Sequence, residues 1–224
     1  MTVLFGSSFL LLIPAIILAG YAQWKVRSTY AKYSTVVASN RITAQQTAER
    51  ILANAMISDV DIETSQRALS DHYDPTKKIL SLSAPDSSSL SAVGIAAHEA
   101  GHAIQHSQNY APLTLRTSIV PIAKFGSQLA LPLFFLGIFT QASSFITFGI
   151  IAFSAAVLFT LITLPVEFDA SRRAIVALRA NHIVNEEEIG GVKEVLFAAA
   201  LTYVAAAAMA GIQLLMMLST RRRR

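Results

Sequence analysis

The chain has 224 residues, of which 53% are hydrophobic and 14% are charged, a balance far more apolar than that of an ordinary soluble domain. Its net charge of +4 owes much to Arg221 to Arg224, and basic residues do not alternate with aromatic ones elsewhere, which argues against a nucleic-acid partner. No cysteine is present, which excludes disulfides and thiolate ligands and leaves histidine, aspartate and glutamate as the strong metal ligands.

Four segments of the chain are apolar over close to the roughly 20 residues that span a hydrocarbon layer. They predict a mainly α-helical, multi-pass protein of the cell membrane, with about four transmembrane helices in contact with the lipid bilayer. The segments are Val3–Tyr21, Ile119–Phe139, Phe145–Leu164 and Val195–Leu218.

The first of these segments is expected to be an uncleaved transmembrane anchor that occupies residues 1–24. A secretory signal peptide is the alternative, since Ala19-Gly20-Tyr21-Ala22 loosely resembles a cleavage site. A signal peptide carries its positive charge before the apolar run, whereas here Lys25 and Arg27 follow it. The pattern favours an anchor with its N-terminus outside.

Residues 25–118 form the long polar stretch of the chain and must supply most of the water-facing structure. Near its start, Thr43-Ala44-Gln45-Gln46 has the form of a capping box. Apolar residues follow at helical spacing, which predicts an amphipathic helix. They are Ala48, Ile51, Leu52, Ala55 and Met56.

Between Val60 and Ser83 the pattern changes to short alternating pieces separated by the turn-forming run Asp71–Pro75, which predicts a small hairpin or sheet. The last piece alternates and stops at Pro85, so we expect an edge strand with free backbone groups. Such a strand can bind an extended peptide by strand addition, with loose sequence preference. The residues expected to do so are Leu80, Ser81, Leu82 and Ser83.

Ser87 to Ser89 offer N-caps to a helix that runs from Ala92 to about His106 and carries His98-Glu99-Ala100-Gly101-His102. Two histidines four residues apart lie one turn apart on the same helix face and can hold one metal ion. Glu99 lies at the flank of that face, where it can reach a metal-bound water as a general base without being a ligand. A catalytic zinc site needs a third protein ligand and one position open for the water.

Two apolar segments follow this helix and are joined by a few uncharged residues, which predicts a transmembrane hairpin at residues 119–164. Both ends of a hairpin return to one side of the membrane, so residues 165–194 are expected on the same side as residues 25–118. Residues 195–224 are expected to form a last transmembrane helix with a basic tail. The side that holds the histidines carries more lysine and arginine and is expected to be cytoplasmic, although the basic tail contradicts this if the last segment crosses fully.

Two residues compete for the third ligand position. His106 continues the four-residue stripe, but along an unbroken helix it lies about 6 Å beyond His102, which favours a supporting or surface role. Glu167 lies where the third apolar segment ends, on the side that holds the two histidines, and is the better candidate. The alternative for Glu167 is an ion pair with Arg172 or Arg173 at the interface.

Five separated pieces carry a wider pattern: Asp71–Pro75, Leu80–Ser83, His98–His106, Pro165–Ala174 and Leu201–Ala205. In order and approximate spacing they resemble the YugP-like family of neutral membrane zinc metallopeptidases. More distantly, the layout is similar to that of the heat-shock and prenyl-protein membrane peptidases, which are gluzincins. The resemblance implies a small zincin-like α+β catalytic portion. It also implies one Zn²⁺ per chain, bound by His98, His102 and Glu167, with Glu99 as the base.

The chain departs from the distant relatives at one supporting position. Those relatives usually place an aspartate four residues after the ligand glutamate, where it holds a histidine, and this chain has Ser171 there. Either Ser171 or Asp169 is expected to take that role. The relatives also suggest a nearby donor for the developing oxyanion, for which Tyr203 is the first candidate here and His72 and His182 are alternatives.

We therefore expect a membrane-integrated zinc endopeptidase that hydrolyses membrane or membrane-adjacent proteins. A membrane-protein partner or a second copy of the chain is a further expected contact. One alternative is a scaffold or partner-binding protein without catalytic activity, in which zinc only stabilises the structure. The presence of Glu99 argues against it, because a structural zinc site needs no base beside the metal. Another is metal transport along His98, His102 and His106, which would require these residues to lie inside membrane helices rather than in a polar segment.

Overall fold

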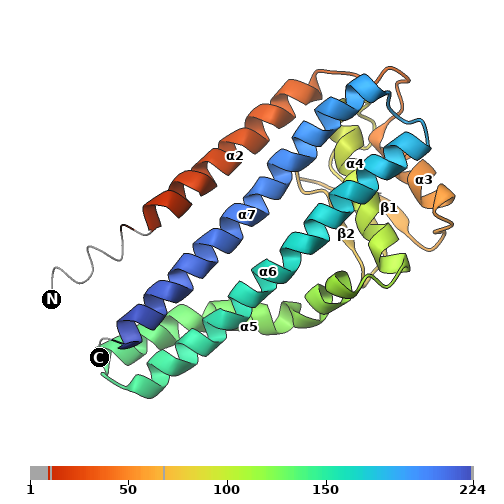
Figure 1. Ribbon diagram of the computed structural model, residues 1–224. Coiled ribbons are helices and arrows are strands. Elements are labelled where there is room, and N and C mark those ends of the chain that lie inside the picture. The colour runs from red at the N-terminus through yellow and green to blue at the C-terminus, as the bar shows by residue number, and fades with distance from the viewer. Residues whose placement is uncertain (1–9, 11, 68, 223–224) are drawn as a thin grey trace. The chain divides into compact units, whose positions relative to one another are not determined.

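The computed structural model describes residues 10, 12–67 and 69–222, and helices dominate it (Figure 1). A mainly helical fold with a small sheet was predicted from the sequence, and this prediction is confirmed. The helices are α2 (Leu12–Ser34), α3 (Ala44–Asn54), α4 (Leu90–Ser107), α5 (Ala111–Phe139), α6 (Ser143–Ala180) and α7 (Glu186–Arg222). The strands are β1 (Asp61–Thr64), β2 (His72–Asp74) and β3 (Ile79–Leu82).

Within the described residues, the three helices α5, α6 and α7 are long and apolar enough to cross a membrane. The predicted apolar segments Ile119–Phe139, Phe145–Leu164 and Val195–Leu218 lie inside these helices. The first predicted segment, Val3–Tyr21, lies partly outside the residues that the structure describes. A count of four membrane spans therefore stays a prediction.

The chain divides into two compact units. The first comprises Met1–Gln23, Thr114–Pro165 and Thr202–Arg224, and its described part has an apolar core that includes Phe134, Ile146 and Ile150. The second comprises Trp24–Leu113 and Val166–Leu201. Its larger core is built mainly from α3, α4, the sheet, the end of α6 and the start of α7.

The first turns of α3 and α4 are capped as the sequence predicts. The Thr43 side chain accepts a hydrogen bond from the Gln46 backbone N–H while the Gln46 side chain accepts from that of Thr43, which completes the capping box. Ser89 caps α4 by accepting from the Ala92 backbone N–H. The prediction for Met56 is wrong, because α3 ends at Asn54 and Met56 lies beyond it, 92% exposed, with φ of 57°.

The sheet has the strand order β1-β3-β2, so β3 is its central strand. β3 pairs in parallel with β1 and antiparallel with β2. The prediction that Leu80 to Ser83 form a free edge strand is therefore wrong. Leu80 and Leu82 are both buried. β1 pairs with the edge of β3 that was expected to be free, and because β1 is polar and lacks apolar alternation, its sequence does not indicate this pairing. The edges of this sheet are β1 and β2.

Candidate metal centre

The four-residue spacing on α4 brings the two histidine side chains of the motif next to each other. The ring centroids of His98 and His102 are 4.7 Å apart, with an interplanar angle of 82°. α4 packs deeply in the second unit, with Leu90, Val93 and Ala97 in its core. Because that packing fixes the helix axis, the two imidazoles are presented in a defined orientation rather than on a mobile loop.

Glu167, on α6, supplies a carboxylate to the same point. Its Oε2 atom lies 3.2 Å from His98 Nε2 and 3.6 Å from His102 Nε2. One ligand atom from each of the three residues lies within 4.8 Å of the others. In a tetrahedral zinc site with bonds of about 2.0–2.1 Å, neighbouring ligand atoms are about 3.4 Å apart. The spacing and chemistry of these three side chains thus fit a zinc ion.

A close approach of two helix backbones allows this convergence. Gly101 lies between the two histidines, and a Cβ atom placed on it would be 2.6 Å from the carbonyl oxygen of Ala170 on α6. Only a residue without a side chain permits this approach. Gly101 was not singled out from the sequence. The signal was a glycine in the interior of a predicted helix, which usually has a packing reason because it weakens the helix.

Replacing Gly101 with alanine should push α4 and α6 apart. The expected result is a loss of about 1–3 kcal/mol in the free energy of unfolding, as for other overpacked sites, together with weaker zinc binding. Thermal unfolding and zinc titration of the purified protein measure both. Gly190→Ala on α7 is the matched control, since nothing lies within 4 Å of the new Cβ atom there. Unchanged zinc affinity in Gly101→Ala would contradict the role given to this contact.

Each of the two histidines has a hydrogen-bond partner at its Nδ1 atom, the ring nitrogen that does not face Glu167. Ser171 Oγ lies 3.2 Å from His98 Nδ1, and Gln105 Oε1 lies 3.0 Å from His102 Nδ1. Of the two predicted supporting residues, Ser171 is thus the one that contacts a histidine, whereas Asp169 contacts Gln105. Gln105 was missed from the sequence, although its position three residues after His102 puts both on one helix face.

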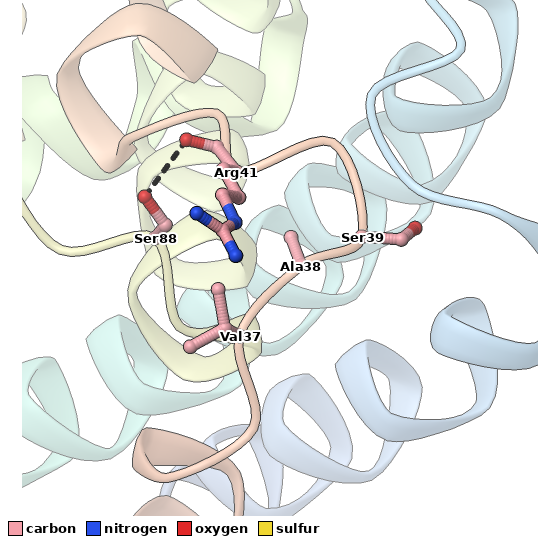
Figure 2. Close-up of a pocket in the computed structure, with 5 residues that line it drawn as sticks. All are labelled: Val37, Ala38, Ser39, Arg41 and Ser88. Atoms are coloured by element: carbon pink, nitrogen blue, oxygen red, sulfur yellow. Dashed lines mark hydrogen bonds between the residues drawn. The ribbon is translucent and has the colours of Figure 1, made fainter.

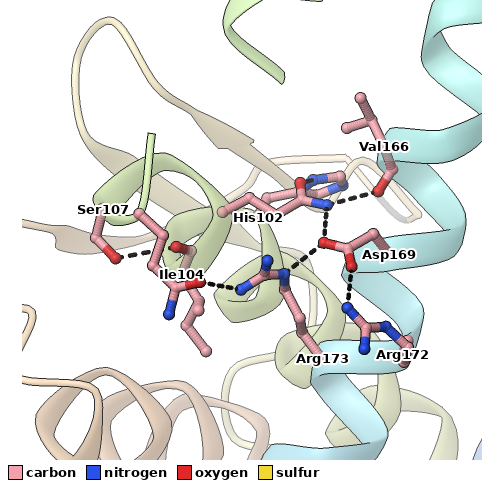
Figure 3. Close-up of polar contacts among 9 residues, drawn as sticks. His102, Ile104, Ser107, Val166, Asp169, Arg172 and Arg173 are labelled. Atoms are coloured by element: carbon pink, nitrogen blue, oxygen red, sulfur yellow. Dashed lines mark hydrogen bonds and ion pairs between the residues drawn. The ribbon is translucent and has the colours of Figure 1, made fainter. Parts of the chain in front are cut away.

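The two arginines considered as partners for Glu167 pair with another carboxylate instead. Figure 3 shows Asp169 between Arg172 and Arg173, with an interaction to each. Arg173 also donates to the side-chain oxygen of Gln108. Glu167 faces the two histidines, with its side chain only 4% exposed.

Glu99 is buried beside the cluster, with 7% of its surface exposed. Burial raises the pKa of its carboxyl group to about 7, while the neighbouring His98 and the backbone N–H of Tyr73 act in the opposite direction. A group with a pKa near the working pH is well matched to accepting and returning a proton.

His106 contacts a tyrosine rather than the three clustered side chains. Tyr73 OH lies 2.8 Å from His106 Nδ1, and burial raises the pKa of the Tyr73 hydroxyl to about 12, so it stays protonated and can donate to the imidazole. His106 is not among the three residues whose ligand atoms converge. Tyr203 belongs to the first unit, and its role as an oxyanion donor stays a prediction.

A separate hollow lies where the segment after α2 meets the start of α4. It measures about 650 Å³ and is lined by Val37, Ala38, Ser39, Arg41 and Ser88 (Figure 2). Ser88 Oγ donates to the backbone carbonyl of Arg41 across it. None of the predicted site residues lines this hollow, so it is distinct from the group formed by His98, His102 and Glu167.

Comparison with known proteins shows the family to which the chain belongs. The family described as "Putative neutral zinc metallopeptidase" matches residues 8–222. The chain is also 46% identical over 207 residues to "Putative membrane protease YugP" of Bacillus subtilis (strain 168), a match that covers 92% of each chain. No solved structure matches it. The chain belongs to this family of neutral zinc metallopeptidases, which confirms the resemblance carried by its motifs.

Proposed function

We propose that this protein is a membrane-integrated, zinc-dependent endopeptidase that cleaves extended segments of membrane or membrane-adjacent proteins. The observation that carries the proposal is the convergence of His98, His102 and Glu167 beside the buried Glu99. Membership of a zinc metallopeptidase family supports the same reaction class. A scaffold that used zinc only as a staple would have no need of a buried carboxylate next to the metal.

In the proposed mechanism, His98, His102 and Glu167 hold one zinc ion per chain. A zinc ion bound there would polarise the scissile carbonyl and acidify a water molecule. Glu99 accepts the proton of that water as it attacks and then passes it to the leaving amine. Ser171 and Gln105 orient the imidazoles through their second nitrogens.

Substrate binding is proposed along β2 rather than β3. β2 is an edge strand, and its central residue, Tyr73, lies close enough to Glu99 for its backbone N–H to lower the pKa of that carboxyl group. A peptide added in extended form near this edge would lie next to the base. Recognition through backbone groups would give loose sequence preference.

The membrane arrangement is proposed to follow the sequence pattern. Residues 1–24, the hairpin at 119–164 and residues 195–224 would supply four spans, with residues 25–118 and 165–194 on the cytoplasmic side. The excess of lysine and arginine in these two parts supports that orientation. The α4 histidine pair together with a glutamate ligand from a later helix supports a gluzincin-like, zincin-type site.

Removing and restoring the metal tests the proposal. The full chain, purified in detergent, is expected to contain one zinc per molecule and to cleave an unfolded, fluorescently labelled protein. A chelator should abolish cleavage, and a stoichiometric amount of zinc should restore it. Cleavage that persists in metal-free protein would overturn the zinc mechanism. Bound zinc with no cleavage would favour the scaffold.

A further inference from the structure

Gln105 is a fully buried amide between α4 and α6, the two helices that carry His98, His102 and Glu167, with 0% of its surface exposed. Its Nε2 atom donates to the backbone carbonyl of Val166 at 2.8 Å and to Asp169 Oδ2 at 3.0 Å. Its Oε1 atom lies 3.0 Å from His102 Nδ1. Figure 3 shows the contacts around Val166, His102 and Asp169.

The acceptors on one side of this amide determine its orientation. The carbonyl of Val166 offers no proton, and neither does the carboxylate of Asp169, which is paired with two arginines. Both N–H groups of Gln105 are therefore directed at these two acceptors, and its carbonyl oxygen faces His102. Amide nitrogen and oxygen are often hard to tell apart, but here the neighbouring groups leave one assignment.

The orientation of the amide in turn determines the state of the histidine. A carbonyl oxygen only accepts, so the hydrogen bond at His102 Nδ1 requires a proton on that nitrogen. In a neutral imidazole, Nε2 is then unprotonated, and this is the atom that lies 3.6 Å from Glu167 Oε2. His98 lacks such a restriction, because the Ser171 hydroxyl next to its Nδ1 can either donate or accept.

We propose that Gln105 is a positioning residue that fixes His102 in the tautomer with the Nδ1 proton, so that Nε2 is ready to bind metal. Asp169, held by Arg172 and Arg173, keeps the amide turned in the required direction. The inference rests on the proposed zinc site, since the tautomer matters for function only if His102 is a ligand.

Three variants of the full chain separate this role from simple packing. Gln105→Met keeps the side-chain length and removes both the acceptor and the donors. Gln105→Glu is the conservative variant, because its carboxylate still accepts from His102 Nδ1, although it faces Asp169 with like charge. Gln45→Met is the matched control, since Gln45 is exposed and its side chain donates a hydrogen bond to Glu49, away from the histidines.

The first measurement is the tautomer of His102 in metal-free protein with ¹⁵N-labelled histidine, by NMR at about pH 8.5, where histidine side chains are usually neutral. A His102→Asn variant assigns the signal. The parent chain, Gln45→Met and Gln105→Glu are expected to show the proton on Nδ1, and Gln105→Met a mixture. The second measurement is zinc affinity by competition with a chelating dye. It is expected to fall about 10- to 100-fold in Gln105→Met, as for other lost supporting contacts, and not in Gln45→Met.

The outcomes distinguish the two hypotheses. A parent chain with the proton on Nε2, or a Gln105→Met variant with unchanged tautomer and zinc affinity, overturns the role of Gln105. If Gln105→Met does not fold, Gln105→Glu decides, because a proton on Nε2 in that variant contradicts the proposal. A parent chain that binds no zinc overturns the metal site instead, and the tautomer in the metal-free protein still reports on Gln105.

Discussion

Replacing Glu99 with glutamine is expected to leave zinc bound while peptide hydrolysis slows by about 10²- to 10⁴-fold, the range that a general acid–base group contributes. The reason is geometric, since the ligand atoms that converge come from His98, His102 and Glu167. Burial already disfavours the charged form of Glu99, so a neutral side chain of the same shape should not destabilise the fold.

Zinc content, thermal unfolding and cleavage of an unfolded protein should be measured on the same preparation of Glu99→Gln. Glu49→Gln is a suitable control, because Glu49 is exposed on α3 and contacts Gln45 rather than the cluster. Loss of activity with zinc retained supports the assignment. Undiminished cleavage would show that another group accepts the proton.

Removal of the Glu167 carboxylate, unlike the Glu99→Gln change, should release zinc, and activity should be lost as a result. In Glu167→Ala the zinc affinity is expected to fall by more than about 100-fold, which is above the cost of losing a supporting contact. Two histidines alone leave zinc one protein ligand short of the usual catalytic set. The variant should still fold, since Glu167 contributes little to the apolar core.

Zinc titration and metal content measure the effect of Glu167→Ala. Glu186→Ala serves as the control, because Glu186 is exposed at the start of α7 and pairs with Arg179. Full zinc occupancy in Glu167→Ala would point to His106 or Asp169 as the third ligand. The structure argues against both, since His106 contacts Tyr73 and Asp169 contacts two arginines.

Local patterns in the sequence were enough for the parts of the fold that depend on near neighbours. The capping box at Thr43 and the cap at Ser89 involve hydrogen bonds across three residues, so the sequence alone specifies them. The histidine pair follows from helix geometry in the same way. Glu167 could be proposed as a partner because the ends of a membrane hairpin return to one side.

Contacts between distant segments were harder to foresee. The alternating pattern of β3 does not say whether other strands pair with it on one edge or on both. β1 carries two acidic residues, so its sequence does not indicate that it pairs with β3. Gly101 and Gln105 owe their importance to α6, which meets α4 more than 60 residues later in the chain. Gly101 matters because of its close approach to Ala170, and Gln105 because of its hydrogen bond to Val166, and neither contact can be read from the sequence near α4.

The sequence separation of 69 positions between His98 and Glu167 has a consequence for the timing of synthesis. A nascent chain that has emerged only as far as α4 carries both histidines and Glu99 but lacks the third ligand. The proposed site is completed only after both apolar segments of the predicted hairpin have been made. On this assignment the enzyme would stay inactive until the predicted hairpin has been made, and it could not cleave unfolded neighbours, or itself, before that point.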